Sequence, residues 1–180
     1  MKTKLFIGIL ALQCVWVIAT SLVHERALAT GTVVLLETRP VDPRDLLRGD
    51  YVTLSYNISD VPENLFIPAA TNQLTHGCTV WVALKPNGKF HQLSHASTYR
   101  IEPAPDEVVL KGRNSGQSWR STNAIQVNYG LERYYVREGT GNPRGKLTVQ
   151  AVVPASGQAR IKEVFIDGKP YAESMKAKGS

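Results

Sequence analysis

The chain is poor in the residues that usually reveal a chemistry. Its 180 residues include two cysteines, Cys14 and Cys78, and four histidines. Cys14 lies in an apolar N-terminal run and Cys78 lies far beyond it, so a membrane helix would keep them apart, and we expect no intrachain disulfide. The motif Gly-x-Ser-x-Gly, which presents a nucleophilic serine in many hydrolases, does not occur. The sequence therefore indicates neither redox nor serine-hydrolase chemistry.

The chain also lacks a cluster of basic residues. Its net charge is +6, but lysines and arginines alternate with acids, as in Arg44-Asp45 and Glu132-Arg133. Because nucleic-acid binding uses a basic stripe, often with aromatic platforms, we expect no nucleic-acid partner. His91 and His95 would lie about 13 Å apart on a strand, and no cysteine or carboxylate cluster completes a metal site beside them. We expect no metal and no other cofactor.

A long apolar run begins close to the N-terminus. Leu5–Val23 carries no charge and would span about 28 Å as a helix, close to the thickness of a hydrocarbon core. Lys2 and Lys4 precede it and favour a cytoplasmic N-terminus. We predict a retained signal anchor that contacts the lipid bilayer through Leu5–Val23, in the inner (cytoplasmic) membrane. The alternative is a cleaved signal peptide, because Ala27-Leu28-Ala29 has the form of a cleavage site.

The remainder of the chain shows the two-residue periodicity of β-strands much more often than helical periodicity. Strands are expected at residues 32–38, 51–58, 79–84, 90–94, 98–101, 107–113, 124–129, 146–153 and 160–166. Asn87-Gly88 supplies the positive φ of a tight hairpin turn. This spacing predicts a mainly β fold, an antiparallel barrel or sandwich, with one N-terminal transmembrane helix.

Two further segments complete the predicted organisation. Leu131, Tyr134 and Tyr135 fall at i, i+3 and i+4, which predicts a short helix over Leu131–Glu138. The last nine residues are basic and are expected to form a flexible tail. The predicted division is a cytoplasmic tip and anchor at 1–23, a β-rich extracytoplasmic domain at 24–171 and the tail at 172–180.

The most specific segment of the chain is Val41–Tyr56. In it, Asp42-Pro43 starts a turn, Asp45 caps a one-turn helix, and the arginines neutralise the acids, so most of these charges have a structural explanation. Its prolines also make the loop rigid, and rigid charged loops lose little entropy on binding. We therefore predict a partner-binding surface, composed of Asp42, Arg44, Asp45, Arg48, Asp50, Tyr51 and Tyr56.

Within that segment, Gly49-Asp50-Tyr51-Val52-Thr53-Leu54-Ser55-Tyr56 matches Gly-Asp-Tyr-x-x-Leu-x-Tyr, the string that names the GDYXXLXY protein family. Tyr129–Tyr135 and Ile166–Pro170 also resemble that family. Its members are bacterial membrane-anchored proteins without an established activity, so the resemblance implies a location and an architecture but supplies no catalytic residues. It implies a periplasmic domain in the cell envelope and a multi-span membrane protein as partner.

Leader peptidases resemble the chain more distantly, in their N-terminal anchor, their β-rich domain and a Pro-x-Leu-x-x-Gly-Asp turn. Pro43–Asp50 is similar to that turn with one extra residue. The serine nucleophile of those enzymes stands three residues before the proline, where this chain has Pro40, with Val41 beside it. Neither side chain can attack a carbonyl, so the sequence argues against peptidase chemistry.

We therefore predict a non-catalytic binding or assembly component of the cell envelope. The alternative is an envelope hydrolase with a carboxylate/histidine site, using Asp42, Asp45 or His91.

Overall fold

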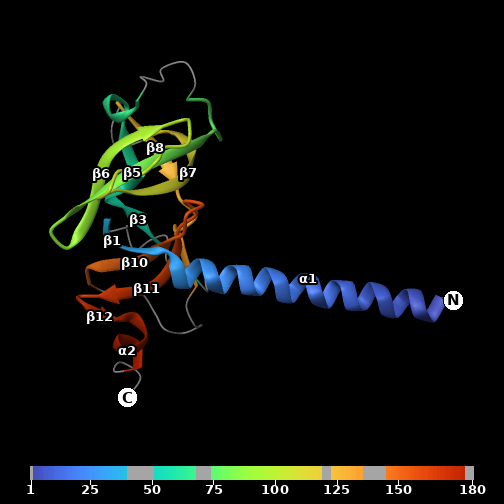
Figure 1. The fold of residues 1–180 in the computed structure, drawn as a ribbon. Coiled ribbons are helices and arrows are strands. Elements are labelled where there is room, and N and C mark those ends of the chain that lie inside the picture. The colour runs from blue at the N-terminus through green and yellow to red at the C-terminus, as the bar shows by residue number, and fades with distance from the viewer. Residues whose placement is uncertain (1, 40–50, 68–73, 119–122, 136–144, 177–180) are drawn as a thin grey trace.

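The chain folds into one long N-terminal helix and a mainly β domain. The computed structural model describes residues 2–39, 51–67, 74–118, 123–135 and 145–176. Helix α1 (Lys2–Thr30) projects from the β domain as a single rod (Figure 1). Its segment Phe6–Val23 has a mean hydropathy of 2.2, and none of it is buried within the protein. This helix is long and apolar enough to cross a membrane, and a signal sequence has the same character.

The strands within the described residues form two five-stranded sheets and one two-stranded sheet. The prediction of a mainly β, antiparallel fold is confirmed. The first sheet has the order β12-β11-β10-β1-β3, with bounds Lys169–Pro170, Arg160–Ile166, Leu147–Val153, Thr32–Arg39 and Ser55–Tyr56. The second has the order β4-β8-β7-β5-β6, with bounds Asp60–Pro62, Ala124–Asn128, Val108–Gln117, Thr79–Asn87 and Phe90–Ser97. The third pairs β2 (Tyr51–Thr53) with β9 (Arg133–Tyr135).

Short helical elements complete the described chain. Two one-turn 3₁₀ helices, η2 (Asn57–Ser59) and η3 (Glu63–Leu65), flank β4, and α2 (Tyr171–Lys176) follows β12. Helix α2 occupies the first part of the segment that was predicted to be a flexible tail. The largest fully buried side chains, Tyr56, Tyr129, Leu36, Leu84, Leu110 and Leu131, come from both large sheets and from the connections between them. The sheets therefore share one core in a nearly closed, barrel-like arrangement.

Two of the contacts between the large sheets are hydrogen bonds donated by backbone N–H groups of the strands. On one side, the Leu35 N–H of β1 donates to Nδ1 of His91 in β6 at 3.3 Å. Burial lowers the pKa of His91, which favours the neutral ring that this hydrogen bond requires. On the other side, the Lys111 N–H of β7 donates to the carbonyl of Gly157 at 2.8 Å, in the turn that joins β10 to β11. Each contact links a strand to a segment far away in the sequence.

Three local predictions are wrong. Residues 57 and 58, which were predicted to continue the strand that begins at residue 51, belong to the 3₁₀ helix η2. Thr98–Ile101 is not a strand, because the chain bends after β6 and the Tyr99 N–H donates to the Ser97 hydroxyl at 3.1 Å. The helix predicted over Leu131–Glu138 is not formed in its described part, because Arg133–Tyr135 is strand β9, paired with β2. Tyr134 packs its ring edge-on against Tyr171, with centroids 5.5 Å apart. The i, i+3, i+4 spacing was compatible with a strand whose hydrogen-bonding partner lies far away in the sequence.

The turn that docks on β7 generates the first testable prediction. Gly157 has φ +77, and a Cβ there would lie 2.9 Å from the Trp81 ring and 3.2 Å from the Val109 carbonyl. The Gly157→Ala substitution should therefore lower the free energy of unfolding by about 2–4 kcal/mol, through left-handed backbone strain and overpacking together. Chemical denaturation of the full chain in detergent measures this loss.

The matched control is Gly168→Ala. Gly168 has a similar φ of +83, but a Cβ there meets nothing within 4 Å. Only the backbone strain applies at this position, so we expect a loss of about 1–2 kcal/mol. Equal losses for the two variants would contradict the close approach of Gly157 to Trp81.

Candidate functional site

Residues 51–54 of the Gly-Asp-Tyr-x-x-Leu-x-Tyr string pair antiparallel with residues 132–135. The register of β2 with β9 is Tyr51↔Tyr135, Val52↔Tyr134 and Thr53↔Arg133. The next residue extends the pairing, because the Leu54 N–H donates to the Glu132 carbonyl at 2.8 Å. Leu54 is 2% exposed and lies in the core. Two of the three stretches that resemble the family in sequence thus meet in space.

Two buried tyrosines fasten this pairing, and we call them the tyrosine clasp. The Tyr56 hydroxyl donates to the Leu131 carbonyl at 2.7 Å, and the Tyr129 hydroxyl donates to the Ile58 carbonyl at 2.7 Å. Each tyrosine therefore binds the backbone of the segment that carries the other one. Because both rings are buried, each hydroxyl satisfies a carbonyl that water does not reach.

Glu132 stabilises the turn that leads from Tyr129 into β9. Its carboxylate accepts the Tyr129 N–H at 2.5 Å and the Gly130 N–H at 2.9 Å. Burial raises the pKa of Tyr56 and of Tyr129, and the nearby Glu132 carboxylate raises both further. Both hydroxyls are therefore neutral hydrogen-bond donors throughout the ordinary pH range.

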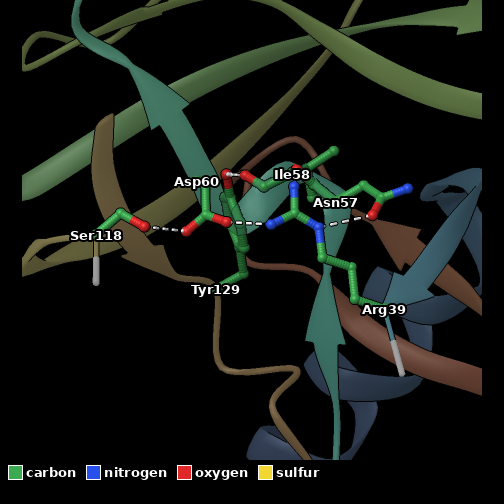
Figure 2. Close-up of polar contacts among 6 residues, drawn as sticks. All are labelled: Arg39, Asn57, Ile58, Asp60, Ser118 and Tyr129. Atoms are coloured by element: carbon green, nitrogen blue, oxygen red, sulfur yellow. Dashed lines mark hydrogen bonds and ion pairs between the residues drawn. The ribbon is translucent and has the colours of Figure 1, made fainter. Parts of the chain in front are cut away.

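A polar network lies beside the clasp, where β1, η2 and β4 meet the end of β7 (Figure 2). The Arg39 guanidinium forms an ion pair with Oδ2 of Asp60 and donates through Nε to Oδ1 of Asn57 at 2.8 Å. The other Asp60 oxygen accepts the Ser118 hydroxyl at 2.8 Å. Figure 2 shows Tyr129 alongside, with its hydroxyl on Ile58. One carboxylate thus connects the end of β1 to the segment that follows β7.

The contacts of this network connect strands to one another. The Ser118 hydroxyl donates to a carboxylate whose second oxygen is bound by Arg39, and a carboxylate stabilised by a cation is a weak base for activating a serine. The side chains of Asp60 and Arg39 are 12% and 31% exposed. A largely covered ion pair with satisfied hydrogen bonds fixes the relative position of the strands that carry it.

A second cluster surrounds Glu107, just before β7. The Ser94 hydroxyl and Nδ1 of His95 both approach Oε1 of Glu107, at 2.8 and 3.5 Å, and Nζ of Lys85 lies 3.4 Å away. Neighbouring residues of a strand normally point to opposite faces. Here the pairing of β5 with β6 shifts at Ala83/Leu84, so that Ser94 is an extra residue and can share a side with His95.

This cluster differs from a catalytic triad in geometry. In a triad the serine contacts one ring nitrogen of the histidine and the carboxylate contacts the other, whereas Ser94 and His95 both meet the same Glu107 oxygen. Burial alone would raise the pKa of Glu107, but hydrogen bonds from Ser94 and from the Ala104 N–H, together with His95 and Lys85, hold it below its ordinary value. The cluster therefore holds an ionised carboxylate between two strands and a turn.

The structure places two of the seven predicted site residues. Tyr51 starts β2, opposite Tyr135. Tyr56 is fully buried, so its side chain belongs to the core and does not contribute to a surface. Asp42, Arg44, Asp45, Arg48 and Asp50 lie outside the described residues, and the partner-binding role of that loop stays a prediction. Among the described residues, no group of three or more His, Cys, Asp or Glu side chains could hold a metal ion.

Sequence reasoning missed the Arg39–Asp60–Ser118 network. Its members are separated by 21 and 58 residues, and no local motif connects them. The burial of Tyr56 had a signal, because Val52, Leu54 and Tyr56 alternate along one face of the expected strand. The packing of the tyrosines followed from that alternation, but the particular carbonyls that they bind did not.

The tyrosine clasp yields a prediction for stability and its pH dependence. Tyr56→Phe and Tyr129→Phe should each lower the free energy of unfolding by about 1–3 kcal/mol, because each leaves a buried carbonyl without a donor. Tyr99→Phe is the matched control, since Tyr99 is 58% exposed, and should change stability by less than about 0.5 kcal/mol. Equilibrium denaturation of the full chain in detergent measures all three.

At alkaline pH, the two clasp tyrosines should ionise differently from the exposed tyrosines. Burial raises the pKa of each clasp tyrosine above the ordinary tyrosine value of about 10. The stabilisation is therefore complete below about pH 10 and is lost as the pH rises further, because the unfolded chain ionises first. Absorbance at the tyrosinate wavelength should show both hydroxyls ionising only with unfolding. Ionisation of all seven tyrosines in the folded chain would contradict the clasp.

Comparison with known proteins gives one family. The model of the GDYXXLXY protein family matches residues 13–164, which include most of α1 and nearly all of the β domain. Neither the curated proteins nor the solved structures give a significant match. The matched range contains the paired segments 51–54 and 132–135 and both tyrosines of the clasp. The chain is therefore a member of the GDYXXLXY protein family.

Proposed function

We propose that the protein is a single-pass membrane protein whose β domain lies in the periplasm and serves as a non-catalytic binding or assembly component of the cell envelope. The main support for this proposal is the exposed apolar surface of α1. Phe6–Val23 is strongly apolar and 0% of it is buried by the rest of the protein. An apolar surface of that length is stable in a bilayer and is not covered by the domain.

The polar clusters of the described residues support binding over catalysis. Asp60 and Glu107 each hold strands and turns together, and Nδ1 of His91 is occupied by the Leu35 N–H. The hydrolase alternative would require His91 to meet Asp42 or Asp45 in a polar pocket. Nδ1 of His91 is engaged in the contact between the two large sheets, which favours a structural role for this ring nitrogen.

The predicted binding loop has two fixed ends. It follows Arg39, whose guanidinium is held by Asn57 and Asp60, and it precedes Tyr51, which pairs with Tyr135. A charged loop between two fixed strands can present its side chains to a partner at a small entropic cost. We propose Asp42, Arg44, Asp45, Arg48 and Asp50 as partner contacts, with a multi-span membrane protein as the partner.

Photocrosslinking in native membranes tests this function. A benzophenone amino acid at Asp45 or at Arg48 should yield the same discrete product with a membrane protein. The same probe at Asp106, an exposed acid before β7, should not yield that product. The absence of a product at both loop positions, or identical products at all three, would refute the partner role of the loop.

The intact mass of the chain from the same membranes tests the anchor. A retained anchor predicts a mass that includes α1 and its recovery with the membrane after alkaline extraction. A chain that begins near Thr30 and leaves the membrane on extraction would show that α1 is a cleaved signal peptide and would overturn the anchor.

A further inference from the structure

The turn between β10 and β11 lies at the α1 side of the domain. Strand β10 is antiparallel to β1, and its last residue, Val153, pairs with Thr32, two residues after α1 ends at Thr30. The chain then turns through Pro154–Gly157 and returns as β11, in which Arg160 pairs with Val152. In Figure 1, α1 leaves the domain close to the end of β10. This end of the domain therefore faces the same way as α1 extends from it.

The length of α1 sets the distance between this turn and the lipid. Its apolar window ends at Val23 and the helix continues to Thr30, a rise of about 10 Å at 1.5 Å per residue. The headgroup layer on each side of the hydrocarbon core is about 5–8 Å thick. An anchored α1 thus brings the turn to the outer edge of the headgroups, within reach of extended Arg and Lys side chains.

Cations and an aromatic ring gather at this turn. Arg100 and Lys111 each approach the Trp81 ring, with the Arg100 Cζ and the Lys111 Nζ both 5.7 Å from its centroid. Nη2 of Arg100 also donates to the Ala155 carbonyl at 3.3 Å. Each cation keeps further N–H donors for a ligand, because Arg carries five and Lys three.

An open cleft is lined in part by the residues that directly follow the turn. It has a volume of about 420 Å³ and is lined by Gly130, Arg133, Gln158, Ala159, Arg160 and Ile161. The walls carry two guanidinium groups and an amide, with apolar side chains between them. Groups of this kind can bind the oxygens of a phosphate. Acidic side chains near this end include Glu25 on α1 and Glu132, whose carboxylate is bound by two backbone N–H groups.

We propose that this end of the domain binds the phosphate groups of anionic lipid headgroups, through Trp81, Arg100, Lys111 and Arg160, which we call the α1-side patch. The proposal rests on the proposed membrane anchor, which holds the patch against the bilayer. The cleft beside Arg160 takes a headgroup phosphate, and Trp81 lies at the level where amphipathic aromatic rings are enriched in membrane proteins. The bound lipid fixes the orientation of the β domain on the membrane.

Native mass spectrometry of the full chain, released from detergent micelles, tests the patch. The micelles contain equal amounts of dioleoyl-phosphatidylglycerol and dioleoyl-phosphatidylcholine, and the ratio of the two bound lipids is measured. The wild-type chain should prefer phosphatidylglycerol. The double substitution Lys111→Gln/Arg160→Gln should reduce this preference by about 25-fold, since each cation near an anionic surface contributes about fivefold.

Two further variants complete the test. Lys89→Gln/Lys169→Gln removes the same charge from exposed positions outside the patch and should keep the preference. Arg160→Lys retains the charge and should keep most of the preference for phosphatidylglycerol. This single variant tests the patch even if the double variant does not fold. An absent wild-type preference, an equal loss in both double variants, or a complete loss in Arg160→Lys would overturn the patch.

The same spectra separate this proposal from the anchor. The intact mass shows whether α1 is present in each chain. A chain without α1 refutes the anchor and the patch together, whereas a chain with α1 but no lipid preference refutes the patch alone.

Discussion

The structure depends on one long-range pairing, in which residues 51–54 lie antiparallel to residues 132–135 and the tyrosine clasp fastens the two segments. The clasp hydrogen bonds join residues that are 75 and 71 positions apart in the sequence. Closing such loops is entropically costly, and the buried Leu54, Tyr56 and Tyr129 side chains offset that cost with apolar contact and with satisfied carbonyls. In this account the Gly-Asp-Tyr-x-x-Leu-x-Tyr string is conspicuous because its leucine and last tyrosine build the core.

The other polar groups extend the same structural theme. Asp60 connects the end of β1 to the segment after β7, and Glu107 connects a turn to β5 and β6. These carboxylates hold strands together, and the two surfaces that we propose for interaction are the loop between Arg39 and Tyr51 and the end of the domain that faces α1. Both proposals concern such surfaces: the first involves a protein partner and the second involves the headgroups beneath the domain.

Much of the fold could be predicted from local sequence. Strands β1, β5, β10 and β11 alternate over several residues, and Asn87-Gly88 supplies a turn conformation that few residue pairs adopt, so each signal was contained within its own element. Strand β9 could not be predicted in this way, because its spacing fits a helix and only its pairing with β2 makes it a strand. The Arg39–Asp60 ion pair had no local signal for the same reason, whereas the alternation of Leu54 and Tyr56 did indicate a buried face.

Native-state hydrogen exchange at the Leu54 amide tests the structural role of this pairing, because that N–H donates to Glu132 at the end of the pairing that lies next to the tyrosine clasp. If the pairing holds the domain together, this amide exchanges only when the whole domain unfolds, and its opening free energy falls with denaturant along the slope of global unfolding. Exchange of Leu54 through small openings that denaturant does not affect, while the core of β5 and β7 stays protected, would contradict the account.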